Sequence, residues 1–458
     1  MKRVITQYLK PYYGRMSFGF LIKFFGTITE LFLPWILAFM IDTVIPTKDS
    51  GQIYLWGLAM LCCSALALIF NVIANRMASR VARDTTEKIR FDLFEKITYL
   101  SSEEMDKFTK PSLISRLTSD TYNVNQMLGR IQRLGIRAPI MLIGGIVITM
   151  SLDAALSGVL VCSLPLLGLV MYLVSRKSIP MFTGLQEATD RFVRLVREDI
   201  GGIRIIKALS KDQFERERFG KINDEVVARE QKANAVTAII NPAMNVILNL
   251  GLVIVILLGA SRVNSGLSQV GKILAFMTYF TIILNSMLAI SRMFVTLSKA
   301  IASASRICGV LDAKGEPQPE AQPRQADDSY LRFDHVSFSY SKGEYNLEDI
   351  SFRLSKGETL GIIGETGAGK STIVNLLMRF YDADRGGIYI DGADIRSLEL
   401  TKLREKFGVV FQNDVIFEDS IRENIRLGRD LTDQEIEEAV LYSRAKEFVE
   451  EKGGEVQA

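Results

Sequence analysis

Six apolar segments, each long enough to cross a lipid bilayer as a helix, constrain this chain more than any other feature. A hydrocarbon core of ~30 Å requires ~20 mostly apolar residues in helical conformation. In chain order, the segments cover residues 17–41, 53–75, 134–152, 155–175, 239–260 and 271–295. We therefore predict that residues 1–312 form an all-α, six-helix transmembrane domain in contact with the lipid bilayer. The basic and aromatic residues 1–15 are expected to form an interfacial helix before the first span.

The Lys and Arg residues concentrate in two long connections, one after the second segment and one after the fourth. They are Arg76, Arg80, Arg83, Lys88, Arg90 and Lys96 in the first connection, and Arg176, Lys177, Arg191, Arg194, Arg197, Arg204 and Lys207 in the second. An excess of basic residues marks the cytoplasmic side of a membrane protein. We therefore predict a multi-pass protein of the cell membrane with both termini in the cytoplasm. The net charge of +3 is too small to indicate a nucleic-acid partner.

Both long connections are predicted to be long cytoplasmic helical extensions. Between residues 78 and 108 the apolar positions recur at helical spacing, and ~30 residues at ~1.5 Å each would extend ~45 Å from the bilayer. Pro111 should break this first rod, and residues 112–120 should lead the chain back toward the membrane. In the second connection, residues 203–209 form an apolar and basic run at the corresponding turn. Such faces either transmit force to another domain or pack within their own domain.

Several polar residues lie inside the apolar segments. Asn241, Asn245 and Asn249 are spaced four residues apart, so the fifth segment carries a stripe of amides on one helical face. Amides avoid bare lipid, and this stripe should either form hydrogen bonds between helices or line a substrate path. The same question applies to Glu30 on the first segment and to Asn285 and Arg292 on the sixth. Lys23 is too far along the helix to pair firmly with Glu30, and its ammonium should extend toward the membrane interface.

A change of composition separates a second domain from the spans. Residues 313–329 are rich in Pro, Gln, Asp and Glu and are predicted to be a linker. Residues 330–458 then begin with two strand-like pieces, LRFDHVSFSY and DISFRL, in which apolar and polar residues alternate. Residues 359–364 should form an apolar strand that runs directly into a glycine-rich loop and then a helix. The pair Asp391 and Gly392 is expected to form a hairpin turn. This part is therefore predicted to be a partial α/β nucleotide-binding domain of the P-loop class.

The loop itself has the sequence GETGAGKS, which fits the phosphate-binding P-loop pattern at every fixed position. Its glycines allow backbone angles that let successive N–H groups converge on phosphates at the start of a helix. Lys370 should lie against the β and γ phosphates, Ser371 should bind Mg²⁺, and Thr372 should support the start of the helix. The predicted ATP-binding residues in this segment are Gly364, Glu365, Thr366, Gly367, Ala368, Gly369, Lys370, Ser371 and Thr372.

With these motifs in this order, the chain resembles a half-transporter of the ABC exporter family, in which six spans are fused to one ATP-binding domain. The resemblance implies that Tyr340, in VSFSY, stacks on adenine. It also implies that Gln412, in GVVFQ, contacts Mg²⁺ or the attacking water. Together with Lys370, Gln412 is the expected catalytic residue. Residues 112–120 and 203–209 are similar to the family's coupling segments, although Pro111 and Leu209 depart from its usual residues there.

The resemblance also implies partners and a mode of action. Members work as pairs of half-transporters, either homodimers or heterodimers, and use ATP and Mg²⁺ to export their substrates. A cavity with amides and scattered charges in an apolar bundle suits an amphipathic small molecule, a lipid or a peptide as substrate.

The family's signature motif, its Walker B acid and its switch histidine are not found before Ala458, and the single histidine, His335, precedes the loop. The chain as written is therefore expected to bind ATP but scarcely to hydrolyse it, as a truncated form of an ATPase-coupled transporter. Two alternatives remain open at the level of sequence. They are a non-hydrolysing short form that regulates or inhibits a partner subunit, and a nucleotide-gated membrane protein.

Overall fold

The structure is a computed structural model, and it describes residues 3–321, 329–340, 343–412 and 415–451. The chain forms two compact units. The first comprises Met1–Leu100 and Glu104–Gly315, and the second comprises Ser101–Glu103 and Glu316–Ala458. Of the predicted linker, residues 322–328 lie outside the described residues. The two units differ completely in architecture, because the first is helical and the second contains the sheet.

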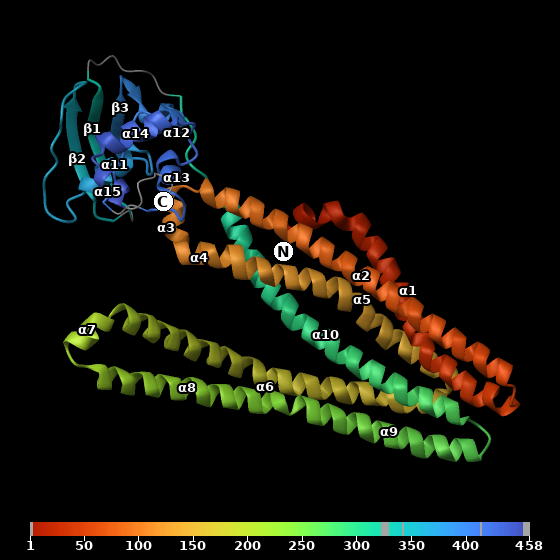
Figure 1. Cartoon of the computed structure of the whole chain (residues 1–458). Helices are drawn as coiled ribbons and strands as arrows, with labels where there is room; N and C mark the ends of the chain where they lie inside the picture. The colour runs from red at the N-terminus through yellow and green to blue at the C-terminus, as the bar shows by residue number, and fades with distance from the viewer. Residues whose placement is uncertain (1–2, 322–328, 341–342, 413–414, 452–458) are drawn as a thin grey trace. The chain divides into compact units, whose positions relative to one another are not determined.

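The first unit is built from long helices (Figure 1). They are α1 Tyr13–Phe39, α2 Ser50–Thr98, α5 Thr121–Leu152, α6 Ala154–Gly201, α8 Asp212–Ala238, α9 Ile240–Asn264 and α10 Val270–Leu311. Six stretches of helix among the described residues are long and apolar enough to cross a membrane, so the predicted six-helix transmembrane domain is confirmed. At ~1.5 Å per residue, α2 is ~70 Å long, more than twice the thickness of a hydrocarbon core. The predicted helical extensions beyond the bilayer are therefore present.

The ends of the two extensions differ from each other. Helix α2 ends at Thr98, which is earlier than the predicted break at Pro111. Two short helices follow, α3 Ser102–Phe108 and α4 Lys110–Ser115. Pro111 lies in the first turn of α4, where a helix needs no backbone N–H from this position. The second extension turns as predicted, through the short helix α7 Ile203–Ala208 between α6 and α8.

The helices of this unit pack in two groups. Helices α1, α2, α5 and α10 pack together, and α6 packs along α8 and α9 in a long hairpin (Figure 1). The core of the first group contains Ile89 and Leu93 of α2, Val124 of α5 and Ile307 of α10. The N-terminal helical turn Val4–Leu9 also belongs to this core. Val4, Tyr8 and Leu9 are buried against apolar partners of this core, and the position of the N-terminal helix at the membrane interface stays a prediction.

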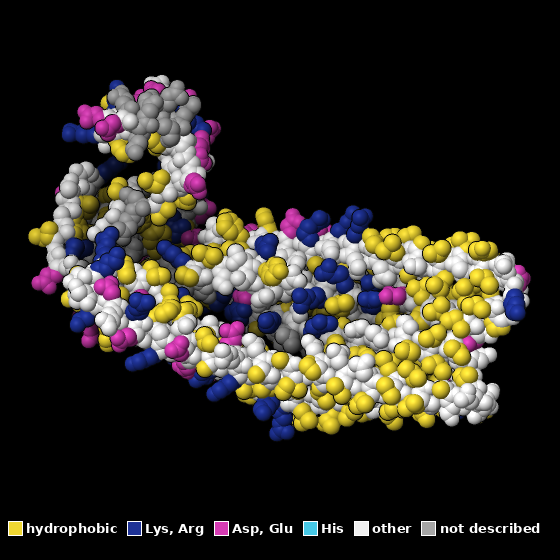
Figure 2. Space-filling model, turned by 60° about the horizontal axis from the view of Figure 1, so that its bottom comes forward, with side chains coloured by type: hydrophobic (Ala, Val, Ile, Leu, Met, Phe, Trp, Pro, Cys, Tyr) yellow, Lys and Arg dark blue, Asp and Glu magenta, His cyan; other side chains and the backbone are white. Residues whose placement is uncertain are grey.

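The surface of the first unit is divided by chemical character. Figure 2 shows hydrophobic side chains covering the end that the apolar spans form, whereas Lys and Arg side chains gather farther along the helices. Large apolar side chains such as Tyr54, Leu61 and Leu257 are 65–78% exposed on the spans. A continuous apolar surface of this kind requires a lipid environment. The protein is therefore a multi-pass membrane protein.

The second unit contains a four-stranded antiparallel sheet in the order β2-β1-β3-β4. The strands are β1 Leu331–Phe338, β2 Leu347–Leu354, β3 Arg385–Ile390 and β4 Ala393–Asp394. Helix α11, Lys370–Leu377, contributes Leu376 to a core with Phe333 and Ile388 of the sheet. The remaining helices are α12 Leu400–Arg404, α13 Ile421–Arg426, α14 Asp433–Tyr442 and α15 Lys446–Glu451. The predicted α/β domain is confirmed.

Two of the three strand predictions in this unit are correct. LRFDHVSFSY contains β1, and DISFRL makes up most of β2, which begins earlier, at Leu347. Asp391 and Gly392 form the turn between β3 and β4 with positive φ at both residues. The strand predicted for residues 359–364 is not formed, and Ile363 is 97% exposed. A strand needs a hydrogen-bonded neighbour, and the described sheet β2-β1-β3-β4 does not include this segment.

Candidate functional site

The glycine loop has the backbone geometry that its sequence predicts. Gly367 and Gly369 have φ values of +91° and +86°, a region that other residues rarely adopt. A Cβ on Gly369 would lie 2.6 Å from Cδ2 of Leu347 and 2.7 Å from the carbonyl oxygen of Asn346. Glycine is therefore required at position 369 both for its backbone angles and for the close approach of β2. The residue after it, Lys370, begins helix α11.

Helix α11 offers an anion site at its N-terminus. The first N–H groups of a helix have no partner within the helix, and the helix dipole favours negative charge at this end. The N–H of Ala368 donates to the carbonyl of Glu365 at 3.2 Å, and the N–H of Thr372 donates to that of Gly369 at 3.0 Å. These two bonds close the loop from residue 365 into the first turn of the helix. The loop therefore has the shape and the polarity to hold a phosphate.

The side chains of Lys370, Ser371 and Thr372 lie in different environments. The Lys370 ammonium donates to the carbonyls of Gly364 at 2.8 Å and of Glu365 at 2.7 Å, so its charge lies over the loop. Ser371 is exposed, and its hydroxyl is accessible to a metal that also contacts phosphate. Mg²⁺ usually takes only one or two protein ligands beside phosphates and water, so a single exposed hydroxyl fits this ion. Thr372 is buried at the start of α11.

Tyr340 lies against the same helix. Its hydroxyl is 3.4 Å from Oγ1 of Thr372 and accepts a hydrogen bond of 3.0 Å from Nδ2 of Asn375. Its ring makes edge contacts with Phe338 and Tyr381 and is 43% exposed. The structure therefore joins Tyr340 to the first turns of α11. Asn375 and Tyr381 were not singled out from the sequence, although Asn375 is one helical turn from Thr372.

Gln412 is not brought to the loop by any contact among the described residues. It is exposed, and residues 413–414 that follow it lie outside the described part of the chain. The role expected for Gln412 remains a prediction.

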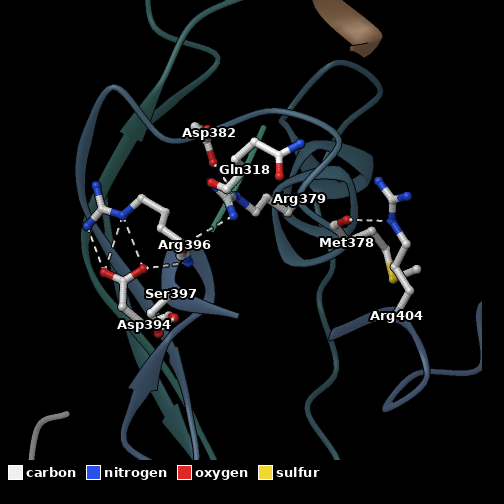
Figure 3. Close-up of polar contacts among 8 residues, drawn as sticks. All are labelled: Gln318, Met378, Arg379, Asp382, Asp394, Arg396, Ser397 and Arg404. Atoms are coloured by element: carbon white, nitrogen blue, oxygen red, sulfur yellow. Dashed lines mark hydrogen bonds and ion pairs between the residues drawn. The ribbon is translucent and has the colours of Figure 1, made fainter. Parts of the chain in front are cut away.

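A buried arginine anchors the far end of α11 (Figure 3). The side chain of Arg379 is fully buried, and its Nε donates to Oδ1 of Asp382 at 2.9 Å. Its two terminal nitrogens donate to the carbonyls of Arg396, at 3.1 Å, and of Gln318, at 3.5 Å. Nearby, Arg404 donates to the carbonyl of Met378 at 3.4 Å. These bonds tie the helix that carries Lys370 to two distant segments of the second unit.

The polar residues of the membrane spans have partners that the sequence did not indicate. Glu30 pairs with Arg137 of α5, at 2.5 Å between Oε1 and Nη2. Lys23 does not extend toward an interface as expected, because it is buried and donates to Asn71 at 2.7 Å and to Asn75 at 3.1 Å. Arg137 was missed, and the available signal was an arginine within the apolar segment 134–152.

The amide stripe of α9 remains on an exposed face. Asn241, Asn245 and Asn249 are all exposed, and Nδ2 of Asn249 donates to the carbonyl of Asn245 at 2.8 Å within the same helix. Arg292 on α10 is also exposed. This arrangement does not decide between an interhelical contact and a substrate path.

Six membrane-crossing helices followed by a phosphate-binding loop on an α/β unit define a membrane transporter fused to an ATP-binding domain. Family comparison agrees with this class. Residues 16–287 match the family described as ABC transporter transmembrane region, and residues 347–455 match the family described as ABC transporter. The chain belongs to the ABC transporter family and has the half-transporter architecture of its exporters.

Several relatives are similar to this chain over most of its length. An uncharacterized ABC transporter ATP-binding protein of Mycobacterium tuberculosis is 29% identical, over 98% of this chain and 79% of the relative. The ABC transporter ATP-binding protein exp8 of Streptococcus pneumoniae is 30% identical, over 98% of this chain and 77% of the relative. A fatty acid ABC transporter ATP-binding/permease protein of Mycobacterium tuberculosis is 32% identical, over 82% of this chain and 59% of the relative.

Proposed function

We propose that this chain is one subunit of an ATP-driven exporter that moves an amphipathic small molecule, a lipid or a peptide out of the cytoplasm. The observation that carries the proposal is the loop at Gly367 and Gly369 with the Lys370 ammonium over it, in one chain with six membrane-crossing helices. The name of one relative, a fatty acid transporter, supports an amphipathic substrate.

The residues of the second unit have distinct proposed roles. Lys370 contacts the β and γ phosphates of ATP, Ser371 binds Mg²⁺, and the partly exposed ring of Tyr340 stacks on adenine. Gln412 contacts the metal or the attacking water. The short helix α7 at the turn between α6 and α8 exposes Ile205 (66%), and this surface docks on an ATP-binding domain. The conformational effect of ATP binding is then transmitted to the spans through α6 and α8, the long helices on either side of α7.

Two further parts of the proposal concern the assembly and its orientation. A second half-transporter, identical or related, completes the transporter, and both chain termini face the cytoplasm of a cell-membrane protein. The basic residues along the long connections support this orientation.

A substitution at the loop tests the proposal. In lipid nanodiscs, Lys370→Ala should weaken binding of a fluorescent ATP analogue about 10-fold or more, because it removes a charge-assisted contact to phosphate. Lys356→Ala is the matched control, since Lys356 is an exposed lysine of the same unit outside the loop. ATP hydrolysis and vesicle transport are measured on the same samples. Equal affinity of the unmodified chain and Lys370→Ala, with both correctly folded, would refute the assignment of the loop.

A further inference from the structure

The first unit contains a small cavity between helices α1, α5 and α10, with a volume of about 160 Å³. Its polar lining consists of Glu30, Arg137, Asn285 and Ser286. The two charged groups face each other, with distances of 2.5 Å from Arg137 Nη2 to Glu30 Oε1 and 3.3 Å from Nε to Oε2. All four residues belong to helices that are long and apolar enough to cross the membrane. Charged groups at such positions are costly and commonly serve a function.

The charges around this cavity do not balance. Lys23 lies two helical turns before Glu30 on α1, is only 4% exposed, and interacts electrostatically with Glu30, Arg133 and Arg137. Its hydrogen-bond partners, Asn71 and Asn75, are neutral. Arg133 donates to a backbone carbonyl, that of Gly129, at 3.0 Å.

In the described part of the chain, neither Lys23 nor Arg133 has a carboxylate at ion-pair distance. The group therefore holds three cations, at positions 23, 133 and 137, and the single anion Glu30. Lys23 is buried, whereas the side chains of Arg137 and Glu30 are 40% and 30% exposed. Because excess charge of one sign on membrane-crossing helices is unfavourable, a bound anion would stabilise this region.

The dimensions and lining of the cavity indicate what kind of anion fits. A water molecule occupies ~30 Å³ in the liquid, so the cavity has room for a headgroup of a few heavy atoms but not for a whole lipid. Arginine presents a planar fork of donors that matches the oxygens of a carboxylate or a phosphate. The rest of the lining is apolar and offers a surface to the first methylene groups of a chain; it consists of Leu134, Ala138, Met141, Ile282 and Ala289.

We propose that this cavity binds the anionic headgroup of an amphipathic molecule. Arg137 is shared between Glu30 and the ligand, the Asn285 amide supplies a neutral hydrogen bond, and Lys23 and Arg133 supply the surplus positive charge. This inference rests on the proposed transport function, of which it specifies the substrate class. The anion comes either from a free amphipath or from an anionic lipid of the bilayer, and the experiment below separates these two sources.

Direct binding of dodecanoate to the whole chain in zwitterionic nanodiscs tests the site, after subtraction of its partitioning into protein-free nanodiscs. The unmodified chain should bind dodecanoate at least about 10-fold more tightly than dodecyltrimethylammonium, which has the same tail and the opposite charge. The double variant Glu30→Gln/Arg137→Gln replaces both members of the ion pair by amides, so that neither member is left without its partner. It should bind dodecanoate about 10-fold more weakly.

Asp153→Asn/Arg262→Gln is the matched control, because it also replaces both members of an ion pair by amides. It removes another ion pair of the same unit, between Asp153 and Arg262 at 3.1 Å, that does not line the cavity. Its affinity for dodecanoate should equal that of the unmodified chain. In nanodiscs that contain an anionic phospholipid, loss of dodecanoate binding would identify the lipid headgroup as occupant, and retention would identify the free amphipath. Both results support an anion site.

Two results would overturn the inference. One is equal binding of dodecanoate and dodecyltrimethylammonium by the unmodified chain, a comparison that requires no variant to fold. The other is unchanged dodecanoate affinity in Glu30→Gln/Arg137→Gln. Binding of the ATP analogue is measured on the same samples, so the two proposals can fail separately. Anion selectivity without nucleotide binding would refute the transporter mechanism, and nucleotide binding without anion selectivity would refute this site.

Discussion

At the scale of residues, the two glycines with positive φ in the phosphate-binding loop differ in the reason why glycine is needed. Gly367 and Gly369 both have a positive φ, but only Gly369 is in close contact with another segment, at Asn346 and Leu347. No heavy atom outside its neighbours lies within 4 Å of a Cβ built on Gly367. A residue with a Cβ would therefore have a strained backbone at either position, whereas it would overlap with another segment only at position 369.

This difference predicts unequal effects of two alanine substitutions. Gly367→Ala should destabilise the second unit by about 1–2 kcal/mol, the cost of a left-handed conformation for a residue with a Cβ. Gly369→Ala should add about 1–3 kcal/mol for the overlap with β2. Thermal unfolding of the two variants, beside the unmodified chain, measures the difference. Equal midpoints for both variants would contradict the steric argument.

The ion pair between Glu30 and Arg137 shows why some residue assignments could not be made from the sequence. Its members are 107 residues apart, and they meet only because α1 and α5 pack side by side. Local spacing directed attention to Lys23, which is on the same helix as Glu30. The amide partners of Lys23 are on α2, and this contact also depends on helix packing.

At the scale of elements, helix α11 is held at both ends. The glycine loop and Tyr340 define its beginning, and the Arg379 side chain connects its end to Asp382 and to backbone carbonyls of two other segments. A helix of eight residues is too short to be stable alone. Its position, and thus that of Lys370, depends on these tertiary contacts.

Removal of the buried guanidinium should therefore loosen the phosphate-binding helix. Arg379→Ala is expected to destabilise the second unit by about 2–4 kcal/mol, because it removes the hydrogen bonds of a fully buried side chain and opens a cavity. Lys402→Ala is the control, since the exposed pair of Lys402 with Glu399 should contribute less than about 1 kcal/mol. Chemical or thermal unfolding gives the stabilities, and the ATP analogue reports the effect on the loop. A stability loss no larger than that of the control would show that the Arg379 bonds are dispensable.

At the scale of the whole molecule, the order of the parts along the chain defines the class of protein. Six spans precede the phosphate-binding loop, and both long helical connections leave the apolar segments on the side that is rich in Lys and Arg. The orientation that we propose follows from this distribution of charge.

Cysteine labelling of intact cells tests the orientation, with the four native cysteines replaced by serine. A cysteine at Lys48, between α1 and α2, should react with a membrane-impermeant maleimide added outside. A cysteine at Lys211, next to α7, should react only after the cells are permeabilised. The opposite pattern would place the ATP-binding unit outside the cell and contradict the proposed function.

The sequence by itself determined the properties that arise from local patterns. Runs of apolar residues predicted the six spans, alternation predicted β1 and β2, and the spacing of glycines and Lys370 predicted the loop at the start of α11. Only the tertiary structure decided which distant groups meet. It paired Arg137 with Glu30, placed Tyr340 against Thr372, and left residues 359–364 without a strand partner. The reason is that a helix or a turn is stabilised by neighbours in the chain, whereas strands, buried charges and cavities are stabilised by partners that only packing brings together.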